Sequence, residues 1–159
     1  MMARQSSAQL WDRHSFMARA RSLPPATVDA LTSLIDFAEQ TGSIEWGLKA
    51  NRPLFNFRCQ TSGRKAVSAF YVEISPSGKN PFALAQIEFD FFKLKGRNLL
   101  PSEIIDHYRK DLVATGAVPK EVIETGNWKF FRVERLRKAE TLEKFKQAVL
   151  NLKEAAASA

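Results

Sequence analysis

The chain lacks the residues on which several classes of protein depend. Cys59 is the only cysteine among 159 residues, so an intramolecular disulfide and a cysteine cluster for zinc or iron–sulfur are both excluded. The two histidines, His14 and His107, are far apart in the sequence and do not have the spacing of a metal site. Because Cys59 lies on the apolar side of an alternating pattern, we expect it to be a buried, inert thiol.

Long hydrophobic runs are also missing. No apolar stretch approaches the ~20 residues that a membrane-spanning helix needs, so we expect no membrane partner. The N-terminus does not have the apolar core of a signal peptide, and a cytoplasmic location is therefore the expectation.

Acidic residues are fewer than basic ones. The sequence has 24 Lys and Arg against 17 Asp and Glu, which gives a formal net charge of +7 and a pI near 9.8. This balance favours an anionic partner, either nucleic acid or an acidic protein surface. Solubility alone is the plain alternative, because net charge bears on association and not on the fold. Hydrophobic residues make up 45% of the chain, and twelve of them are phenylalanines, enough for a substantial core.

Residues 1–23 form a basic N-terminal arm. Asp12 is its only acid, whereas it has four arginines: Arg4, Arg13, Arg19 and Arg21. This composition is typical of an arm that contacts nucleic acid, and also of an organellar transit peptide, which would make the location organellar. A third interpretation is a short helix that docks on the domain or on another subunit. It rests on the apolar residues Leu10, Trp11, Phe16 and Met17.

The remaining sequence predicts a single α/β domain over residues 24–154 and a loose tail at 155–159. Amphipathic patterns predict helices near 26–40, 102–115 and 140–154. Prolines stand at the entrances of the first two helices, and Gly42 and Gly116 follow their last turns.

Alternating patterns between the helices predict strands. In "FALAQIEFDFFKL", Ala85, Ile87, Phe89 and Phe91 share one face, while Gln86, Glu88 and Asp90 share the other. The element order is therefore α-β-β-β-α-β-α. It predicts a two-layer α/β (α+β) sandwich, in which helices cover one face of a mixed, mostly antiparallel sheet and the other face is partly wet. The predicted core contains Phe57, Phe70, Ile87, Phe89, Phe131, Phe145 and Val149.

This element order resembles the core of the PD-(D/E)XK nuclease-like fold. The closing segment "GNWKFFRVERLRKAETLEKFKQAVLNLKEA" is similar to the last strand and helix of a small bacterial family of unknown function that is grouped with that fold. The resemblance implies an acid on the second core strand and an (Asp/Glu)-x-Lys triplet on the third. In active members the two acids hold Mg²⁺, which activates a water. Here Glu73 corresponds to the first acid, and Glu88 and Asp90 to the triplet, with Asp90 where the pattern has Lys.

Three functions remain open on the residues alone. The leading hypothesis is a non-enzymatic binding module, without a cofactor, whose basic surface contacts nucleic acid or an acidic protein. Its candidate contacts lie in turns and at strand ends: Arg64, Lys65, Lys95, Arg97, Arg135, Arg137 and Lys138. The first alternative is a Mg²⁺-dependent nuclease that uses Glu73, Glu88 and Asp90. The second is an assembly or accessory subunit that docks on a partner, or on its own copy, through the arm and the last helix.

Overall fold

The computed structural model describes residues 9–63, 65–77, 80–91, 99–124 and 129–159. Its five strands form one sheet in the order β1-β2-β3-β4-β5, and every pair of neighbouring strands is antiparallel. The strands are β1 (Ile44–Trp46), β2 (Leu54–Gln60), β3 (Ala66–Ser77), β4 (Asn80–Phe89) and β5 (Lys129–Arg132). The helices are α1 (Arg13–Ala20), α2 (Pro25–Gln40), α4 (Ser102–Ala114), α5 (Lys120–Glu124), the 3-10 helix η1 (Val133–Leu136) and α6 (Ala139–Ser158).

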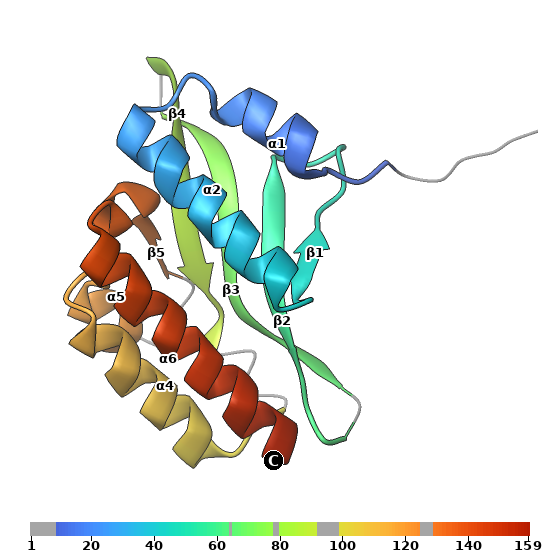
Figure 1. Cartoon of the computed structure of the whole chain (residues 1–159), viewed down its shortest axis with the longest axis vertical. Helices are drawn as coiled ribbons and strands as arrows, with labels where there is room; N and C mark the ends of the chain where they lie inside the picture. The colour runs from blue at the N-terminus through green and yellow to red at the C-terminus, as the bar shows by residue number, and fades with distance from the viewer. Residues whose placement is uncertain (1–8, 64, 78–79, 92–98, 125–128) are drawn as a thin grey trace, which may run out of the picture.

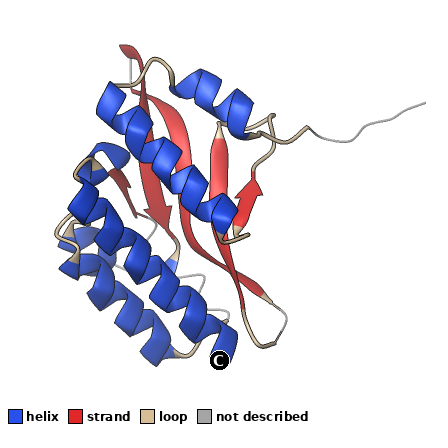
Figure 2. Cartoon of the chain, in the orientation of Figure 1, coloured by secondary structure: helices blue, strands red, loops and turns tan. Residues whose placement is uncertain are grey.

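Helices cover one side of the sheet. Figure 1 shows α1, α2 and α6 lying across the same face of the strands, with α4 alongside α6. Figure 2 shows the same division between a helical layer and a strand layer. The predicted two-layer sandwich is therefore confirmed. Every helix in the described part of the chain is too short or too polar to cross a membrane.

Proline and glycine set the limits of the two central helices. Pro24 precedes α2 and Pro101 precedes α4, where a missing N–H costs nothing. Gly42 and Gly116 follow these helices with φ of 68° and 79°, a backbone conformation that glycine adopts without strain. The last helix is longer than predicted. The tail expected to be loose from residue 155 continues α6 to Ser158, because alanine strongly favours a helix and Ala156 packs into the core.

The N-terminal arm contributes a helix that packs on the sheet. Asp12 caps α1, since its carboxylate accepts a hydrogen bond from the backbone N–H of Ser15 at 2.7 Å. The fully buried Phe16 places its ring 5.4 Å from Phe55 and 5.6 Å from Trp46. This packing agrees with the interpretation of the arm as a helix that docks on the domain. The predicted boundary at residue 23 is not a structural one, because residues on both sides of it belong to one hydrophobic cluster.

A chain of phenylalanine rings forms the centre of the core. Phe57 of β2 stacks on Phe37 of α2 at 5.2 Å and on Phe70 of β3 at 5.5 Å. Phe70 in turn meets Phe145 of α6 edge-on at 5.2 Å. All seven residues of the predicted core are buried, so this prediction is confirmed. The last strand, β5, ends at Arg132, and Val133 begins η1 with its side chain buried.

A bulge in β3 is completed by a side chain from α4. Phe57 pairs with Phe70, whereas Arg58 pairs with Ser68, so that Ala69 is the extra residue. The hydroxyl of Tyr108 donates a hydrogen bond to the carbonyl of Ala69 at 3.0 Å. Burial raises the pKa of Tyr108 well above its ordinary value, which keeps this donor protonated.

We predict that Phe89→Ala destabilises the protein by about 3–5 kcal/mol, through lost burial and a residual cavity. Phe89 is 1% exposed and packs on Phe91, Tyr108 and Phe131. Phe130→Ala is the matched control, because the side chain of Phe130 is 52% exposed and its loss should change stability by about 0.5 kcal/mol or less. Urea denaturation measures both. A loss below about 1 kcal/mol for Phe89→Ala would show that the face assignment is reversed.

Cys59 should resist thiol reagents in the native protein. The residue is fully buried, and burial raises the pKa of its thiol to about 12, so the reactive thiolate is scarce at neutral pH. Between the ordinary pKa of 9.0 and about 12, the unfolded chain binds fewer protons than the native one, and stability should fall as the pH rises. Absorbance with Ellman's reagent, with and without denaturant, measures the protection. Equal rates in both conditions would contradict it.

Candidate functional site

Two of the acids suggested by the nuclease resemblance, Glu73 and Glu88, lie on the sheet face away from the helices. Glu88 pairs with Tyr71 across β3 and β4, and Glu73 pairs with Gln86, so that Glu73 and Glu88 are diagonal neighbours on that face. Asp90 directly follows the last residue of β4. Nη1 of Arg52 lies 3.2 Å from Oε1 of Glu73, which neutralises the first acid. Within the described residues, no group of three or more His, Cys, Asp or Glu side chains is placed to hold a metal ion.

This sheet face is drier at its centre than its alternation predicted. Glu88 is 6% exposed, and Asn56, which pairs with Tyr71 from the other side, is 4% exposed. Oδ1 of Asn56 has no hydrogen-bond partner among the described residues. Two arginines of β2 and β5 pair with other acids: Arg58 with Glu45 at 3.3 Å, and Arg132 with Glu134 at 3.4 Å. Within the part of the chain that the structure describes, these residues therefore do not form a fitting Mg²⁺ site.

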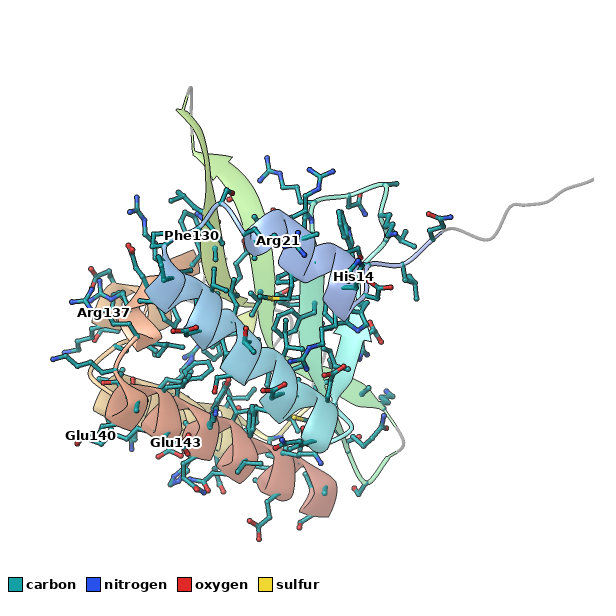
Figure 3. The ribbon with its side chains drawn as sticks, turned by 45° about the horizontal axis from the view of Figure 1, so that its top comes forward. His14, Arg21, Phe130, Arg137, Glu140 and Glu143 are labelled. Atoms are coloured by element: carbon teal, nitrogen blue, oxygen red, sulfur yellow. The ribbon has the colours of Figure 1, made fainter. Side chains whose placement is uncertain are left out.

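Among the predicted basic contacts that the structure describes, Lys65 lies apart from the other three. Arg64, Lys95 and Arg97 lie outside the described residues. Lys65 is exposed just before β3, in the connection between β2 and β3. The hairpin of these two strands extends to the lower right of Figure 1. Arg135, Arg137 and Lys138 are exposed at the junction of η1 and α6, and Figure 3 labels Arg137 at the opposite, left side of the molecule.

Arg135, Arg137 and Lys138 are here called the basic trio. None of the three forms an ion pair with a carboxylate in the described part of the chain. Nε of Arg135 donates a hydrogen bond to the carbonyl of Ala117 at 2.8 Å, which fixes the base of this guanidinium. Lys138 is the N-cap residue of α6 and makes no side-chain cap. The positive end of the helix dipole therefore adds to three exposed cations.

A second basic site was not predicted from the sequence. We call it the α1 cleft: a cleft of about 930 Å³ between α1, the loop before β2, and β3. Three cations line it, and no carboxylate does. The composition of the arm pointed to Arg19, but no sequence pattern placed the β1–β2 loop beside it. The lining residues are Trp11, Ser15, Ala18, Arg19, Ser22, Lys49, Ala50, Asn51, Arg52, Pro53, Ile74 and Ser75.

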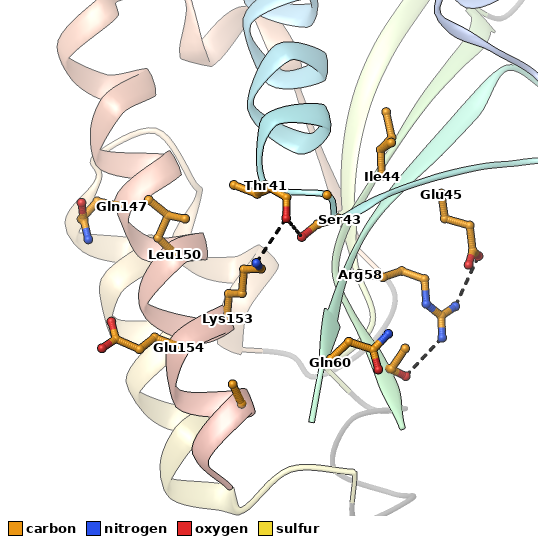
Figure 4. Close-up of a pocket in the computed structure, with 13 residues that line it drawn as sticks. Thr41, Ser43, Ile44, Glu45, Arg58, Gln60, Gln147, Leu150, Lys153 and Glu154 are labelled. Carbon is orange, nitrogen blue, oxygen red and sulfur yellow. Dashed lines mark hydrogen bonds and ion pairs between the residues drawn. The ribbon is translucent and has the colours of Figure 1, made fainter. Parts of the chain in front are cut away.

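Another hollow, of about 810 Å³, lies between α6 and the β1–β2 edge and is shown in Figure 4. Its charges are balanced, and both of its cations are already engaged. Arg58 donates to Glu45 at 3.3 Å and to the carbonyl of Ala66 at 3.2 Å. Nζ of Lys153 donates to the carbonyl of Thr41 at 3.3 Å. This hollow therefore offers an anion much less than the α1 cleft does.

Comparison of the chain with models of known families, with curated proteins and with solved structures finds no match. The resemblance to the PD-(D/E)XK nuclease-like fold therefore stays a prediction. What the molecule does has to be inferred from its own side chains, among which the basic trio and the α1 cleft are the groups best suited to an anionic ligand.

Proposed function

We propose that this protein is a non-enzymatic binding module that contacts the phosphates of nucleic acid. The observation that carries the proposal is the basic trio, in which three exposed cations have no carboxylate partner in the described part of the chain and adjoin the N-terminus of α6. Long cationic side chains at such a position reach phosphates without strain, and the helix dipole favours an anion there.

An exposed aromatic residue adjoins the basic trio in the sequence. Phe130 is 52% exposed on β5, the strand that runs directly into η1. Aromatic side chains stack on bases with little sequence preference, and they do so beside cations in proteins that bind single strands. Phe130 therefore supports nucleic acid over an acidic protein surface as the partner, with binding that is weakly selective for sequence.

The docking alternative loses part of its basis in this structure. The apolar face of α1 buries Phe16 and Ala20, and α6 buries Phe145, Val149 and Leu152 within the same chain. Both faces are thus occupied by the protein's own core. A partner held by the arm and the last helix would have to use their polar sides.

We predict that the double variant Arg137→Ala/Lys138→Ala binds short oligonucleotides more weakly, with a shallower dependence on salt. Each lost phosphate contact should reduce the slope of log K against log salt by about 0.7 to 0.9, because fewer counterions are released. Fluorescence anisotropy at about 50 and about 200 mM salt measures the slope for single and double strands.

Lys120→Ala/Lys144→Ala is the matched control for this variant. It removes the same charge, but these lysines are paired with Glu124 and Glu140. Equal effects of the two double variants would show that overall charge, and not the basic trio, drives binding. No binding by the unmodified protein at the lower salt would favour an acidic protein partner.

We also predict that the purified protein with Mg²⁺ or Mn²⁺ does not cleave DNA or RNA above background. The physical reason is the ion pair of Glu73 with Arg52, which occupies the acid that the nuclease alternative requires. Gel analysis of plasmid and RNA substrates tests this. Divalent-dependent cleavage that Glu88→Gln abolishes, and that the exposed control Glu121→Gln retains, would establish the nuclease instead.

A further inference from the structure

We infer that the α1 cleft binds a phosphate ester, carried either by a free nucleotide or by a nucleic-acid strand. The inference rests on the proposed function, to which it adds a second site, in a cleft away from the basic trio. A volume of about 930 Å³ lies in the range of sites for small organic ligands and exceeds what a bare phosphate fills.

The two walls of the cleft are held together by backbone hydrogen bonds. The N–H of Trp11 donates to the carbonyl of Gly47 at 2.9 Å, and the N–H of Lys49 donates to the carbonyl of Gln9 at 2.8 Å. The N–H of Ile74 donates to the carbonyl of Pro53 at 3.0 Å, which ties the loop to β3. Nε1 of Trp11 adds a bond to the carbonyl of Asn51 at 3.2 Å. A ligand would therefore meet a frame that is already ordered, and binding would cost little conformational entropy.

The charges of the cleft are suited to an anion. The guanidinium of Arg19 lies 5.8 Å from the ring centroid of Trp11, a cation–π contact that orients it without neutralising it. Lys49 forms no ion pair in the described part of the chain. Arg52 uses Nη1 on Glu73, but its side chain is 61% exposed and a guanidinium has five N–H donors. Arginine forks match phosphate oxygens in geometry as well as in charge.

Besides Glu73, the acid Asp12 adjoins a lining residue in the sequence, and it is already engaged. Oδ1 of Asp12 accepts the backbone N–H of Ser15 at 2.7 Å and its hydroxyl at 2.7 Å. These two hydrogen bonds, with a smaller contribution from the charge of Lys49, lower the pKa of Asp12. Asp12 therefore serves as the cap of α1, and it does not line the cleft.

Ser75 provides an unused polar group at the cleft. The residue is 5% exposed, and its hydroxyl makes no hydrogen bond within the described part of the chain. An oxygen of a bound phosphate could accept a hydrogen bond from this hydroxyl. The site differs from a merely basic surface because its cations line a cleft whose walls are joined by backbone hydrogen bonds.

The test compares two neighbouring arginines that differ in one respect. Arg19 lines the cleft, whereas Arg21, which follows α1 and is labelled in Figure 3, is exposed and does not. Binding of inorganic phosphate, adenosine monophosphate and a short single-stranded oligonucleotide is measured at constant ionic strength by calorimetry. The backbone amides of Asn51 and Ser75 are followed in ¹H–¹⁵N spectra, which report on the cleft directly.

We expect Arg19→Ala to weaken binding of the phosphate ester about tenfold or more, the usual effect of one hydrogen bond to a charged group. Arg21→Ala should change it by less than about twofold, because an exposed charge outside the site is screened. Ser75→Ala leaves the net charge unchanged and should weaken binding about threefold, as expected for a neutral hydrogen bond. Circular dichroism confirms that each variant is folded.

The probe whose binding depends on Arg19 identifies the source of the phosphate. Adenosine monophosphate binding that requires Arg19 identifies a free nucleotide, and oligonucleotide binding alone that requires Arg19 identifies a strand; both support the site. Equal effects of Arg19→Ala and Arg21→Ala, or unshifted amides of Asn51 and Ser75, would overturn it. If Arg137→Ala/Lys138→Ala loses oligonucleotide binding while Arg19→Ala and Ser75→Ala retain it, the cleft assignment fails and the proposed function stands.

Discussion

Aromatic packing between the sheet and the helices is the interaction on which the rest of this structure depends. Phe57 and Phe70 on adjacent strands connect α2, through Phe37, to α6, through Phe145. Because side chains alternate along a strand, burying these rings assigns every second residue of β2, β3 and β4 to the opposite face. The positions of Glu73 and Glu88 are therefore a consequence of the core. That the two acids share a face is therefore not evidence of a catalytic site.

Local patterns predicted the elements that local physics controls. Proline and Gly42 marked the ends of α2, and alternation identified β4 and its buried face, since both signals act within a few residues. The bulge at Ala69 was not predictable in this way, because it depends on the register between β2 and β3 and on the hydroxyl of Tyr108, 39 residues away. The burial of Asn56 and Glu88 was missed for a similar reason. Alternation predicts which face of the sheet a residue lies on, but not whether other residues cover that face.

The two candidate sites differ in the same way: the sequence predicted one of them from neighbouring residues, and the other depends on distant contacts. The basic trio is contiguous in sequence, so composition alone found it. The α1 cleft brings Arg19 together with a loop 30 residues further along, and the contact that joins them is the burial of Phe16 against Trp46 and Phe55. An apolar residue in the arm thus positions a charged one. The arm's composition was typical of a nucleic-acid-contacting arm or a transit peptide, whereas the packing of α1 makes it one wall of a cleft.

The distribution of charge also bears on why the chain is basic. Arg13 contacts both Asp36 and Glu39 at 2.6 Å, and the lysines at positions 120 and 144 pair with acids one helical turn away. On a surface whose charges serve only solubility, basic and acidic residues are interspersed in this way. Such ion pairs do not account for the net excess of seven positive charges. Part of it remains at the basic trio and the α1 cleft, where a folding chain gains nothing from like charges held close together. Their repulsion opposes folding, and a bound polyanion would relieve it, so ligand binding and stability should be linked at these two places.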